Sequence, residues 1–379
     1  MNAAPLVIAD DLSGAAEAAA AFGPGTTVLI EPDPATTVPD GPVVLDLETR
    51  GAGPDEAARR TRDALRLTTR PVTVKKIDSQ LRGEVAAELA ALRSDRPVVV
   101  APALPALART VRDGVVHLDG VPLHQTGAWR VEPKPPPRSV AEAVGVADAR
   151  LVTLAEVRGD LDAALASAPV VVCDAETEAD LARIAAVGLR HGALLVGSAA
   201  LCQAVTGLAS PPPRSPTATV APGQRCLVVS GTAELVAREQ VSRLVAATGA
   251  ARVLVPSEPG RDAETAARLA AALEHGDAVV QLEPFVSASA RLAPRLAGIV
   301  ETALADRPPV DLVLLGGTTA YEVLSRLGTR RLVVEAEIHP GAVASRCSRG
   351  RAVTRPGSFG GPDSLLTIHQ YLRPTEGAS

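Results

Sequence analysis

The chain has 379 residues, of which 46% are hydrophobic, and this length and composition suit two packed domains better than a single core. A formal net charge of −5 argues against a nonspecific nucleic-acid-binding or membrane-surface protein, since both of those partners carry negative charge. With four cysteines in no CxxC pair, no signal peptide and no apolar run of membrane-spanning length, we expect a cytoplasmic protein with reduced thiols.

Short apolar runs alternate with alanine-rich helical patterns along most of the chain. Strands are predicted at Leu6–Ala9, Thr27–Ile30, Val43–Leu47, Val72–Ile77, Val98–Ala101, Val170–Cys173, Leu194–Val196, Cys226–Ser230, Arg252–Val255, Val279–Leu282, Leu312–Leu315 and Leu332–Glu335. Helices are predicted between many of them, among others at Pro54–Leu67, Glu84–Leu92, Glu178–His191, Ala233–Val245, Ala263–His275 and Ala320–Leu327. This alternation predicts an α/β fold, with mostly parallel sheets flanked by helices.

Two segments interrupt this alternation. Residues 114–124 hold two short strands around Asp119-Gly120, which predict a β-hairpin. Residues 209–223 are rich in proline and poor in packing residues, which predicts a semi-rigid linker. We therefore place one domain at residues 1–210 and a second at residues 223–373, each with its own mostly parallel sheet.

The first predicted strand ends in two adjacent carboxylates, Asp10 and Asp11, and a helix of small residues follows. Open α/β sheets place ligand sites at the carboxyl ends of their strands, so we interpret both acids as site residues. The alternative is that Asp11 only suits the dipole of the following helix, with Ser13 as its cap. That alternative explains one acid more easily than two.

The strand Val72–Ile77 runs into a dense group of charged and polar side chains. The group consists of Lys75, Lys76, Asp78, Ser79 and Arg82, and Gly83 follows it. A turn needs a glycine and a cap, whereas two cations, a carboxylate and an arginine are not required by a solvated turn. We predict that this group binds a small anion.

In the second half, two strand-to-helix turns are built from small residues. They are Ser230-Gly231-Thr232 and Gly316-Gly317-Thr318-Thr319. Such turns let backbone amides approach a phosphate, although glycine also serves ordinary tight turns. The glycine-rich segment 354–363 predicts a pocket lined by backbone. No Walker A lysine pattern and no GxGxxG occurs, which argues against a P-loop enzyme and against a standard dinucleotide site.

Together these segments resemble the four-carbon acid sugar kinase family, whose members phosphorylate threonate, erythronate or oxo-tetronate with ATP. The resemblance rests on motifs that occur in the family's order and span nearly the whole chain: Ile8–Gly14, Lys75–Gly83, Ala101–Thr110, Val229–Thr232, Gly316–Thr319, Glu337–Gly341 and Gly357–Gly360. The lysine-rich motif is specific, whereas the glycine turns alone would not be.

The resemblance implies a sugar-acid-binding domain followed by a domain that binds ATP and Mg²⁺. The sugar-acid site would comprise Asp10, Asp11, Lys76, Asp78, Ser79, Arg82 and Arg109. The nucleotide site would comprise Ser230, Gly231, Thr232, Gly316, Gly317, Thr318, Pro340, Gly341, Ala342, Val343, Gly357 and Gly360. No metal ligand is assigned, and a homodimer is the expected assembly.

Within that frame we expect Asp11 or Asp78 to accept the proton of the reacting hydroxyl. Arg82 could clamp the substrate carboxylate with two parallel hydrogen bonds, and Lys76 or Arg109 could instead meet the γ-phosphate. The predicted linker suggests closure of the domains over both substrates.

The chain departs from the family pattern at Gln80, Arg130 and Thr318, where the family has Thr, often an acid, and Glu. The alternative reading is therefore a divergent or weak member that binds sugar acid and nucleotide. A dinucleotide-dependent oxidoreductase is a second alternative, against which the missing GxGxxG argues.

Overall fold

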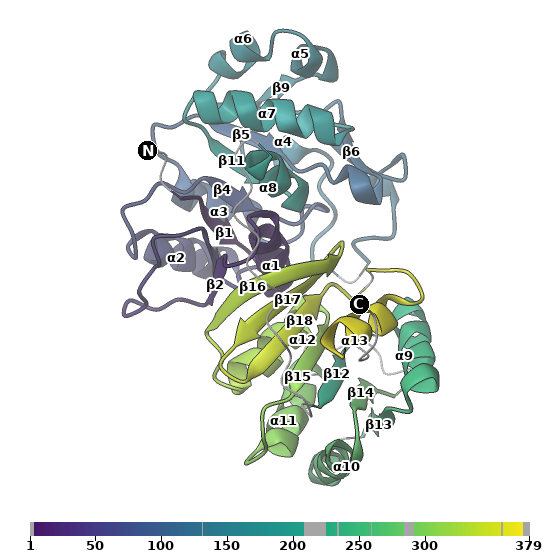
Figure 1. Ribbon diagram of the computed structural model, residues 1–379. Helices are drawn as coiled ribbons and strands as arrows, with labels where there is room; N and C mark the ends of the chain where they lie inside the picture. Colours follow the sequence, from purple (N-terminus) through teal and green to yellow (C-terminus); the bar gives the residue numbers. More distant parts are fainter. Residues whose placement is uncertain are drawn as a thin grey trace, which may run out of the picture. The chain divides into compact units, whose positions relative to one another are not determined.

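The computed structural model describes residues 4–130, 132–207, 225–232, 235–258, 260–283, 292–357 and 359–373 (Figure 1). The chain divides into two compact units, residues 1–213 and 214–379. Each unit is an α/β structure built around a mostly parallel sheet, as the sequence predicted. The proline-rich segment predicted as a linker, residues 209–223, lies outside the described residues.

In the first unit, eight strands pair in the order β2-β3-β1-β4-β11-β5-β10-β9, and every pairing is parallel. Their bounds are β1 Leu6–Ala9, β2 Thr27–Ile30, β3 Val43–Asp46, β4 Val74–Lys76, β5 Val98–Ala101, β9 Arg150–Val152, β10 Val170–Cys173 and β11 Leu194–Gly197. The helices are α1 Leu12–Ala21, α2 Pro54–Leu65, α3 Val85–Leu92, α4 Val140–Ala143, α5 Leu154–Arg158, α6 Leu161–Ala166, α7 Glu178–Arg190 and α8 Ala199–Thr206, with short 3-10 turns at Pro105–Leu107 and Leu123–Gln125.

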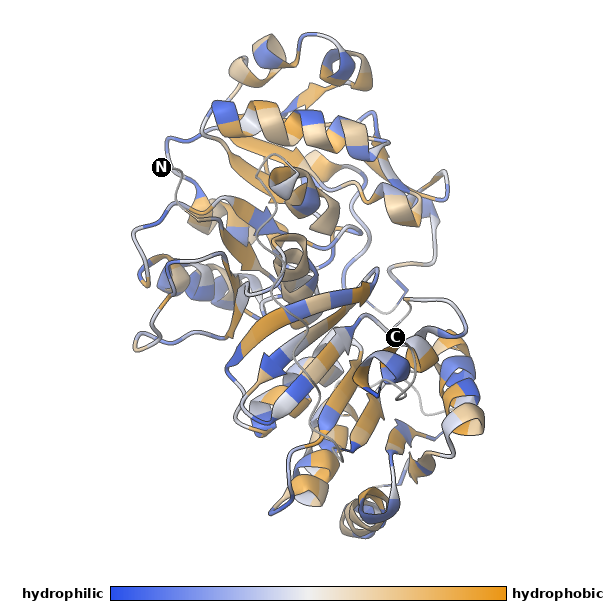
Figure 2. Cartoon of the chain, in the orientation of Figure 1, coloured by the Kyte–Doolittle hydropathy of each residue, from blue (hydrophilic) through white to orange (hydrophobic). Residues whose placement is uncertain are grey.

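Helices cover both faces of this sheet: α1, α7 and α8 lie on one face, and α2 and α3 on the other (Figure 1). Most strands are therefore buried along their whole length, and their runs of Val, Leu and Ile are hydrophobic throughout rather than alternating (Figure 2). Aromatic residues are scarce, and alanines of α1 bring that helix close to the sheet. Ala15, Ala16, Ala18 and Ala19 are all fully buried.

A separate three-stranded antiparallel sheet contains the predicted hairpin. Its strands are β6 Arg109–Arg112, β7 Val115–Leu118 and β8 Val121–Pro122. Asp119 and Gly120 both adopt positive φ, as a two-residue hairpin turn requires, so the predicted hairpin is confirmed. Asp113 and Gly114 form a second turn of the same kind, and the strand before it, β6, was missed.

In the second unit, seven strands pair in the order β13-β14-β12-β15-β18-β17-β16. Their bounds are β12 Cys226–Ser230, β13 Ala251–Val255, β14 Ala278–Leu282, β15 Asp311–Leu315, β16 Arg331–His339, β17 Ala342–Cys347 and β18 Gly350–Arg355. The pairings from β13 to β18 are parallel, whereas β17 is antiparallel to both β18 and β16. The sequence predicted only the start of β16 and missed β17 and β18.

The helices of this unit are α9 Leu235–Thr248, α10 Asp262–His275, α11 Leu292–Leu304, α12 Gly317–Arg326 and α13 Ser364–Leu372. Helices α9 and α13 pack together on one face of the sheet, and α10, α11 and α12 follow one another on the other. The core under α9 and α13 consists of aliphatic side chains such as Val228, Val313, Val353 and Ile368.

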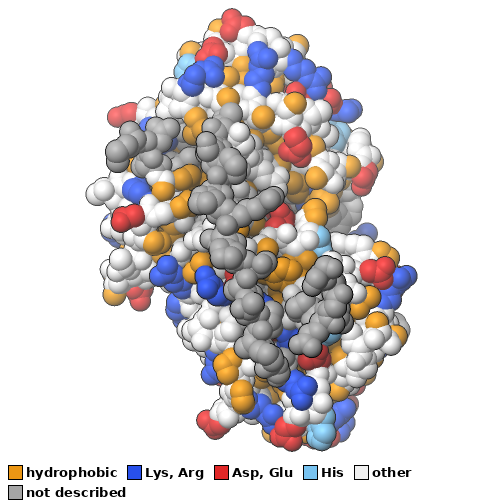
Figure 3. Space-filling model, in the orientation of Figure 1, with side chains coloured by type: hydrophobic (Ala, Val, Ile, Leu, Met, Phe, Trp, Pro, Cys, Tyr) orange, Lys and Arg blue, Asp and Glu red, His pale blue; other side chains and the backbone are white. Residues whose placement is uncertain are grey.

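Among the described residues, no helix combines the length and the apolar character that a membrane span requires. Charged side chains of both signs are scattered over the face of the molecule in Figure 3.

Candidate functional site

The charged residues predicted from sequence gather at one edge of the first sheet. Ala9, Asp46, Lys76 and Gly197 lie level with one another across β1, β3, β4 and β11. Because these strands are parallel, the residues that follow them emerge at the same carboxyl edge. We call this the first-unit edge, defined by Asp10, Asp11, Asp46, Glu48, Arg50, Lys76, Asp78, Arg82 and Arg109.

Arg50 ties the two adjacent acids of the first-unit edge together. Its Nε and Nη2 donate to the two oxygens of Asp10 at 2.9 and 3.0 Å, and Nη2 lies 2.7 Å from Asp11 Oδ1. Burial disfavours the charged form of Asp10, but the positive charges of Arg50 and Lys76 outweigh it and lower the pKa of this carboxyl. Both acids are therefore held as part of one ion-paired group.

Asp11 caps helix α1 as well as carrying charge. Its Oδ1 accepts a hydrogen bond from the Gly14 amide at 3.0 Å, so the cap is Asp11 and not Ser13, which lies inside the helix. Lys76 Nζ lies 3.8 Å from the same oxygen, and a Cβ at Gly14 would collide with it. No hydrogen bond reaches Oδ2 of Asp11 from residues 4–130 or 132–207, which leaves one oxygen for a ligand.

The two adjacent lysines of β4 point to opposite faces of the sheet, as neighbours on a strand must. Lys75 is fully buried, and its Nζ donates to Glu88 Oε1 at 2.6 Å; Thr49 donates to the same oxygen. The prediction that Lys75 belongs to the anion-binding group was therefore wrong, because its charge is used in a buried ion pair. Lys76 keeps a raised pKa: burial opposes the charge, but Asp11 and Asp10 outweigh it.

Asp78 and Arg82 are paired with each other. Arg82 donates from Nε and Nη2 to the two Asp78 oxygens at 2.7 and 2.9 Å, and the amides of Gln80 and Arg82 also donate to Oδ2. Burial alone would raise the pKa of Asp78, but Arg82 and Arg50 lower it far below its ordinary value. Both oxygens of this carboxylate are thus occupied.

Arg109 differs from the other cations of the first-unit edge. Its Nη1 donates to Ser79 Oγ at 2.6 Å, and it has no carboxylate partner within the described ranges. Burial lowers the pKa of its guanidinium, which still remains charged at neutral pH. Arg109 is therefore the cation of this group that is most available to an incoming anion.

Trp129 supports the turn that carries Asp78 and Arg82. Its Nε1 donates to the Gln80 carbonyl at 2.9 Å, and only 9% of the residue is exposed. This burial favours a packing role for Trp129 over stacking on a substrate. Arg130 beside it is exposed.

Two further acids of the first-unit edge, Asp46 and Glu48, were missed. Each has one buried oxygen with no hydrogen-bond partner in the described part of the chain, and Glu48 adopts a positive φ of 45°. Burial and repulsion from Asp11 raise the pKa of Asp46 well above its ordinary value, and burial and Asp46 raise that of Glu48 to about 10. Charge directly after a strand, the signal that indicated Asp10 and Asp78, also marks Glu48 and Arg50 after the predicted strand Val43–Leu47. Asp46 lies inside that strand, so this signal does not mark it.

In the second unit, Ser230, Leu315 and Arg355 lie level on the neighbouring strands β12, β15 and β18. We call this carboxyl edge the second-unit edge. Gly316, at φ 97°, precedes the first turn of α12, and its amide donates to the Arg355 carbonyl at 2.8 Å. Thr318 is exposed at the start of the same helix. Backbone amides at this helix start have the orientation that an anion requires.

Glycines bring the predicted nucleotide segments into contact with one another. A Cβ at Gly231 would collide with Thr319, one at Gly341 with the Phe359 ring, and one at Gly357 would lie 2.9 Å from Thr232 Oγ1. These contacts join the two small-residue turns, the β16–β17 turn and the loop after β18.

The remaining predicted nucleotide residues lie in the same two segments. Pro340 is exposed in the β16–β17 turn, whereas Ala342 and Val343 are buried strand residues of β17, so that only their backbone could meet a ligand. Gly360, at φ 82°, packs on Ser364 at the start of α13.

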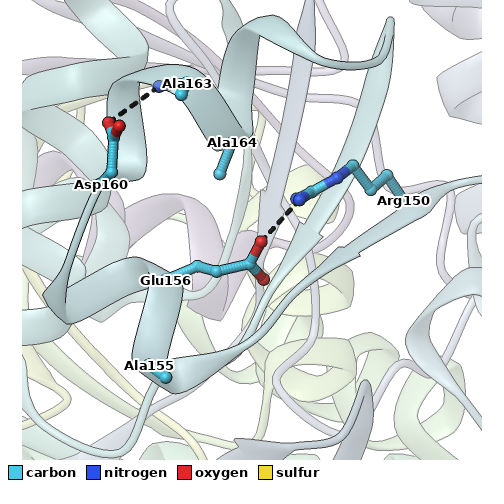
Figure 4. A pocket seen from close by; sticks show the side chains of 6 residues that line it. All are labelled: Arg150, Ala155, Glu156, Asp160, Ala163 and Ala164. Carbon is cyan, nitrogen blue, oxygen red and sulfur yellow. Dashed lines mark hydrogen bonds and ion pairs between the residues drawn. The ribbon is translucent and has the colours of Figure 1, made fainter.

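A pocket of about 430 Å³ lies where β9 meets α5 and α6, and no residue of the first-unit edge lines it (Figure 4). Arg150 Nη2 lies 2.5 Å from Glu156 Oε1, and Asp160 accepts a hydrogen bond from the Ala163 amide. Its charged groups already have partners, and none of the predicted site residues lines it. We therefore assign it no ligand. Among the described residues, no group of three or more His, Cys, Asp or Glu side chains is placed to hold a metal ion.

Comparison with known proteins follows the same division of the chain. Residues 5–205 match the model of the family described as "Sugar-binding N-terminal domain", and residues 227–365 match "Nucleotide-binding C-terminal domain". The chain is 32% identical to a D-threonate kinase of Cupriavidus necator, with 99% of each chain covered. It is also 32% identical to a D-threonate kinase of Bordetella bronchiseptica, with 97% of each covered.

A solved structure from Salmonella typhimurium LT2, titled as a tRNA synthase, matches with a TM-score of 0.80. It is 21% identical, and the match covers 96% of this chain and 98% of that chain. At this identity the likeness shows a shared fold and nothing more.

Proposed function

The chain belongs to the four-carbon acid sugar kinase family, and on this basis we propose that it transfers a phosphoryl group from ATP to a hydroxyl of a four-carbon sugar acid. The observation that carries the proposal is the contrast between the two edges. The first-unit edge gathers carboxylates and cations suited to a hydroxylated anion. The second-unit edge gathers glycines and backbone amides suited to phosphates.

We assign the general base to Asp11. Its Oδ1 is held by Arg50, Lys76 and the Gly14 amide, and Oδ2 has no hydrogen bond among the described residues of this unit. Asp78, the other candidate, has both oxygens bound to Arg82, and its lowered pKa makes it a weaker proton acceptor. In the transfer, the hydroxyl oxygen bonds to the γ-phosphorus, the bond to the ADP oxygen breaks, and the hydroxyl proton passes to Asp11.

The substrate carboxylate is assigned to Arg109. Arg82 could take it only by giving up its paired hydrogen bonds to Asp78, whereas Arg109 has only the Ser79 hydroxyl as partner. In this arrangement Asp78 orients Arg82, and Arg82 remains available to a substrate hydroxyl or phosphoryl oxygen. A guanidinium suits a carboxylate because its fork matches the two oxygens.

The residues of the second-unit edge suit a nucleotide, because the start of α12 at Gly316 and Gly317 offers backbone amides to a phosphate. Gly231 and Gly357 let the neighbouring segments pack closely on Thr319 and Thr232. Mg²⁺ neutralises phosphate charge when bound and is commonly held by phosphates and water, with few protein ligands. We therefore assign it no side chain. The homodimer and the cytoplasmic location expected from the sequence stay predictions.

The test is a coupled assay of ADP release with ATP–Mg²⁺ and a panel of D-threonate, L-threonate, the erythronates and oxo-tetronate. We expect at least one acid to be turned over, with D-threonate, the substrate in the names of the relatives, as the first choice. Calorimetric binding of these acids and of ATP without turnover would instead support the divergent, non-catalytic reading. Gln80 and Thr318 would then be the first positions to revert to the family residues.

A further inference from the structure

Arg355 is a cation that the proposed mechanism leaves unused. It ends β18 at the second-unit edge and is fully buried. Its Nη1 donates to the Phe359 carbonyl and to Ser364 Oγ, the latter at 3.2 Å, but Nε and Nη2 have no hydrogen-bond partner in the described residues. Arg355 also has no carboxylate partner in those ranges. A buried charge in this condition is unfavourable unless a ligand compensates it.

Lys75 shows how the same protein treats a buried cation with a structural role. Arg355 and Lys75 are the two largest fully buried side chains among the described residues. Lys75 is neutralised by Glu88 at 2.6 Å, whereas no described carboxylate pairs with Arg355. Burial lowers the pKa of Arg355 to about 10, so the guanidinium still carries its charge at neutral pH.

Holding the loop after β18 does not require this charge. Gln240 Nε2 already donates to three carbonyls of that loop: Phe359 at 3.4 Å, Gly360 at 3.0 Å and Gly361 at 2.8 Å. A neutral amide on α9 therefore anchors the loop independently of Arg355. The hydrogen bond from Arg355 to the Phe359 carbonyl is therefore partly redundant, and Nε and Nη2 have no described partner.

The position of Arg355 matches the predicted phosphate turns. It lies level with Ser230, which begins the first small-residue turn, and with Leu315, which precedes the second. Its carbonyl accepts a hydrogen bond from the Gly316 amide. Residues two apart on a strand share a face, so its side chain lies on the same face as Val353, the side covered by α9 and α13. Strand β15 lies between the strands of Ser230 and Arg355, so these positions are two strand spacings apart, or about 10 Å.

We propose that Arg355 is a phosphate-binding residue of the nucleotide site, and that its guanidinium exchanges the Phe359 carbonyl for oxygens of the ATP polyphosphate. This inference rests on the proposed function. Ser364 and His339 would hold the fork in place, since Ser364 Oγ lies 2.8 Å from His339 Nε2 as well as beside Arg355 Nη1. The β16–β17 turn and the loop after β18 are thereby linked to the same guanidinium.

The test is calorimetric titration of the full chain and its Arg355→Met variant with ATP–Mg²⁺, ADP, adenosine and inorganic tripolyphosphate. The variant loses charge-assisted hydrogen bonds worth about 1.5–3 kcal/mol, so its affinity for ATP and for tripolyphosphate should fall about 10- to 100-fold. Adenosine affinity should not change. Arg355→Lys should recover part of the loss. The melting temperature of the unliganded Met variant should equal or exceed that of the parent, because an uncompensated buried charge is removed.

Arg351→Met is the matched control. Arg351 lies on the same strand and face, but its Nε pairs with Glu335 at 2.9 Å. This variant should lower the melting temperature and leave the preference for ATP over adenosine unchanged.

Equal ATP binding by the parent and Arg355→Met, or a parallel loss of adenosine binding with a lower melting temperature, would overturn the inference alone. A parent chain that binds neither ATP nor tripolyphosphate would overturn the proposed nucleotide function, and this inference with it.

Discussion

Both carboxyl edges of this protein gather predicted ligand-binding groups at the ends of parallel strands, but the groups differ in chemistry. At the first-unit edge, side chains carry the charge, and nearly every cation already has a carboxylate partner, as Arg50 and Arg82 do. At the second-unit edge, glycines and backbone amides dominate, and the buried guanidinium of Arg355 has no such partner among the described residues. A paired network presents an ordered pattern of donors and acceptors, which suits a small hydroxylated acid. Backbone amides at a helix start and a buried cation without a described carboxylate partner suit a concentrated negative charge.

The comparison predicts that charge, and not shape, decides function at the first-unit edge. Asp11→Asn should lower kcat about 10²- to 10⁴-fold, because the general base is lost. Asparagine keeps the helix cap, but stability should also fall, because Arg50 and the buried Lys76 lose the charge of Asp11. Steady-state kinetics and thermal unfolding of the same preparation measure both effects. Asp78→Asn is the control, and it should act mainly on KM through the freed Arg82. An unchanged kcat in Asp11→Asn would mean that another residue is the general base.

The contrast between the two buried cations predicts opposite effects on stability. Lys75→Met should lower the free energy of unfolding by about 3–5 kcal/mol, because Glu88 is left as an unpaired buried carboxylate. Adding Glu88→Gln should recover most of this loss, since the amide can still accept the hydrogen bond from Thr49. Denaturant titration measures both variants. A loss below about 1 kcal/mol in Lys75→Met would mean that Lys75 is not the structural cation inferred from its burial.

At the second-unit edge, backbone shape should matter in addition to the charge of Arg355. Gly231→Ala places a Cβ against Thr319 and forces the turn to shift, at about 1–3 kcal/mol. We expect the KM for ATP to rise roughly tenfold while the KM for the sugar acid stays constant. Gly276→Ala is the control, because a Cβ there meets nothing within 4 Å. An equal change in both KM values would argue against a local effect on nucleotide.

The last prediction concerns the pH dependence of stability that follows from the raised pKa of Glu48. Its pKa of about 10 in the folded chain lies above its ordinary value of 4.5, so the stability it contributes is complete below about pH 4.5 and declines as the pH rises toward 10. Glu48→Gln is neutral at every pH and should flatten this decline. For each pH unit between about 4.5 and 10, the stability of the parent should fall relative to the variant by about 1.4 kcal/mol. Between pH 8 and 9 this corresponds to about 2–4 °C in melting temperature. The prediction would be contradicted if the melting temperatures of both proteins changed equally with pH between pH 5 and 9.

Much of the fold could be predicted because the parallel strands are continuous apolar runs. Strands such as Leu6–Ala9 and Val170–Cys173 were predicted with their observed bounds. The antiparallel strands β17 and β18 were missed, because their polar residues and flanking glycines resemble loops. Their pairing depends on distant partners that a local pattern does not reveal.

The candidate site divides in the same way. Asp10, Asp11 and Asp78 could be found because charge directly after a strand is a local signal. The assignment of Lys75 to this group was wrong because adjacent residues on a strand point to opposite faces. Lys75 therefore points away from Lys76 and pairs with Glu88. Arg355 could not be identified from sequence, since its lack of a partner is a property of the packed structure.

One further consequence follows from the hydrogen bond between Trp129 and the Gln80 carbonyl. Trp129 is the single tryptophan of the chain. Its intrinsic fluorescence therefore reports on the turn that carries Asp78 and Arg82, with no added label. Sugar acids could be screened by the change in indole emission before any assay of turnover. A ligand that reorders this turn should change the intensity or the wavelength of that emission.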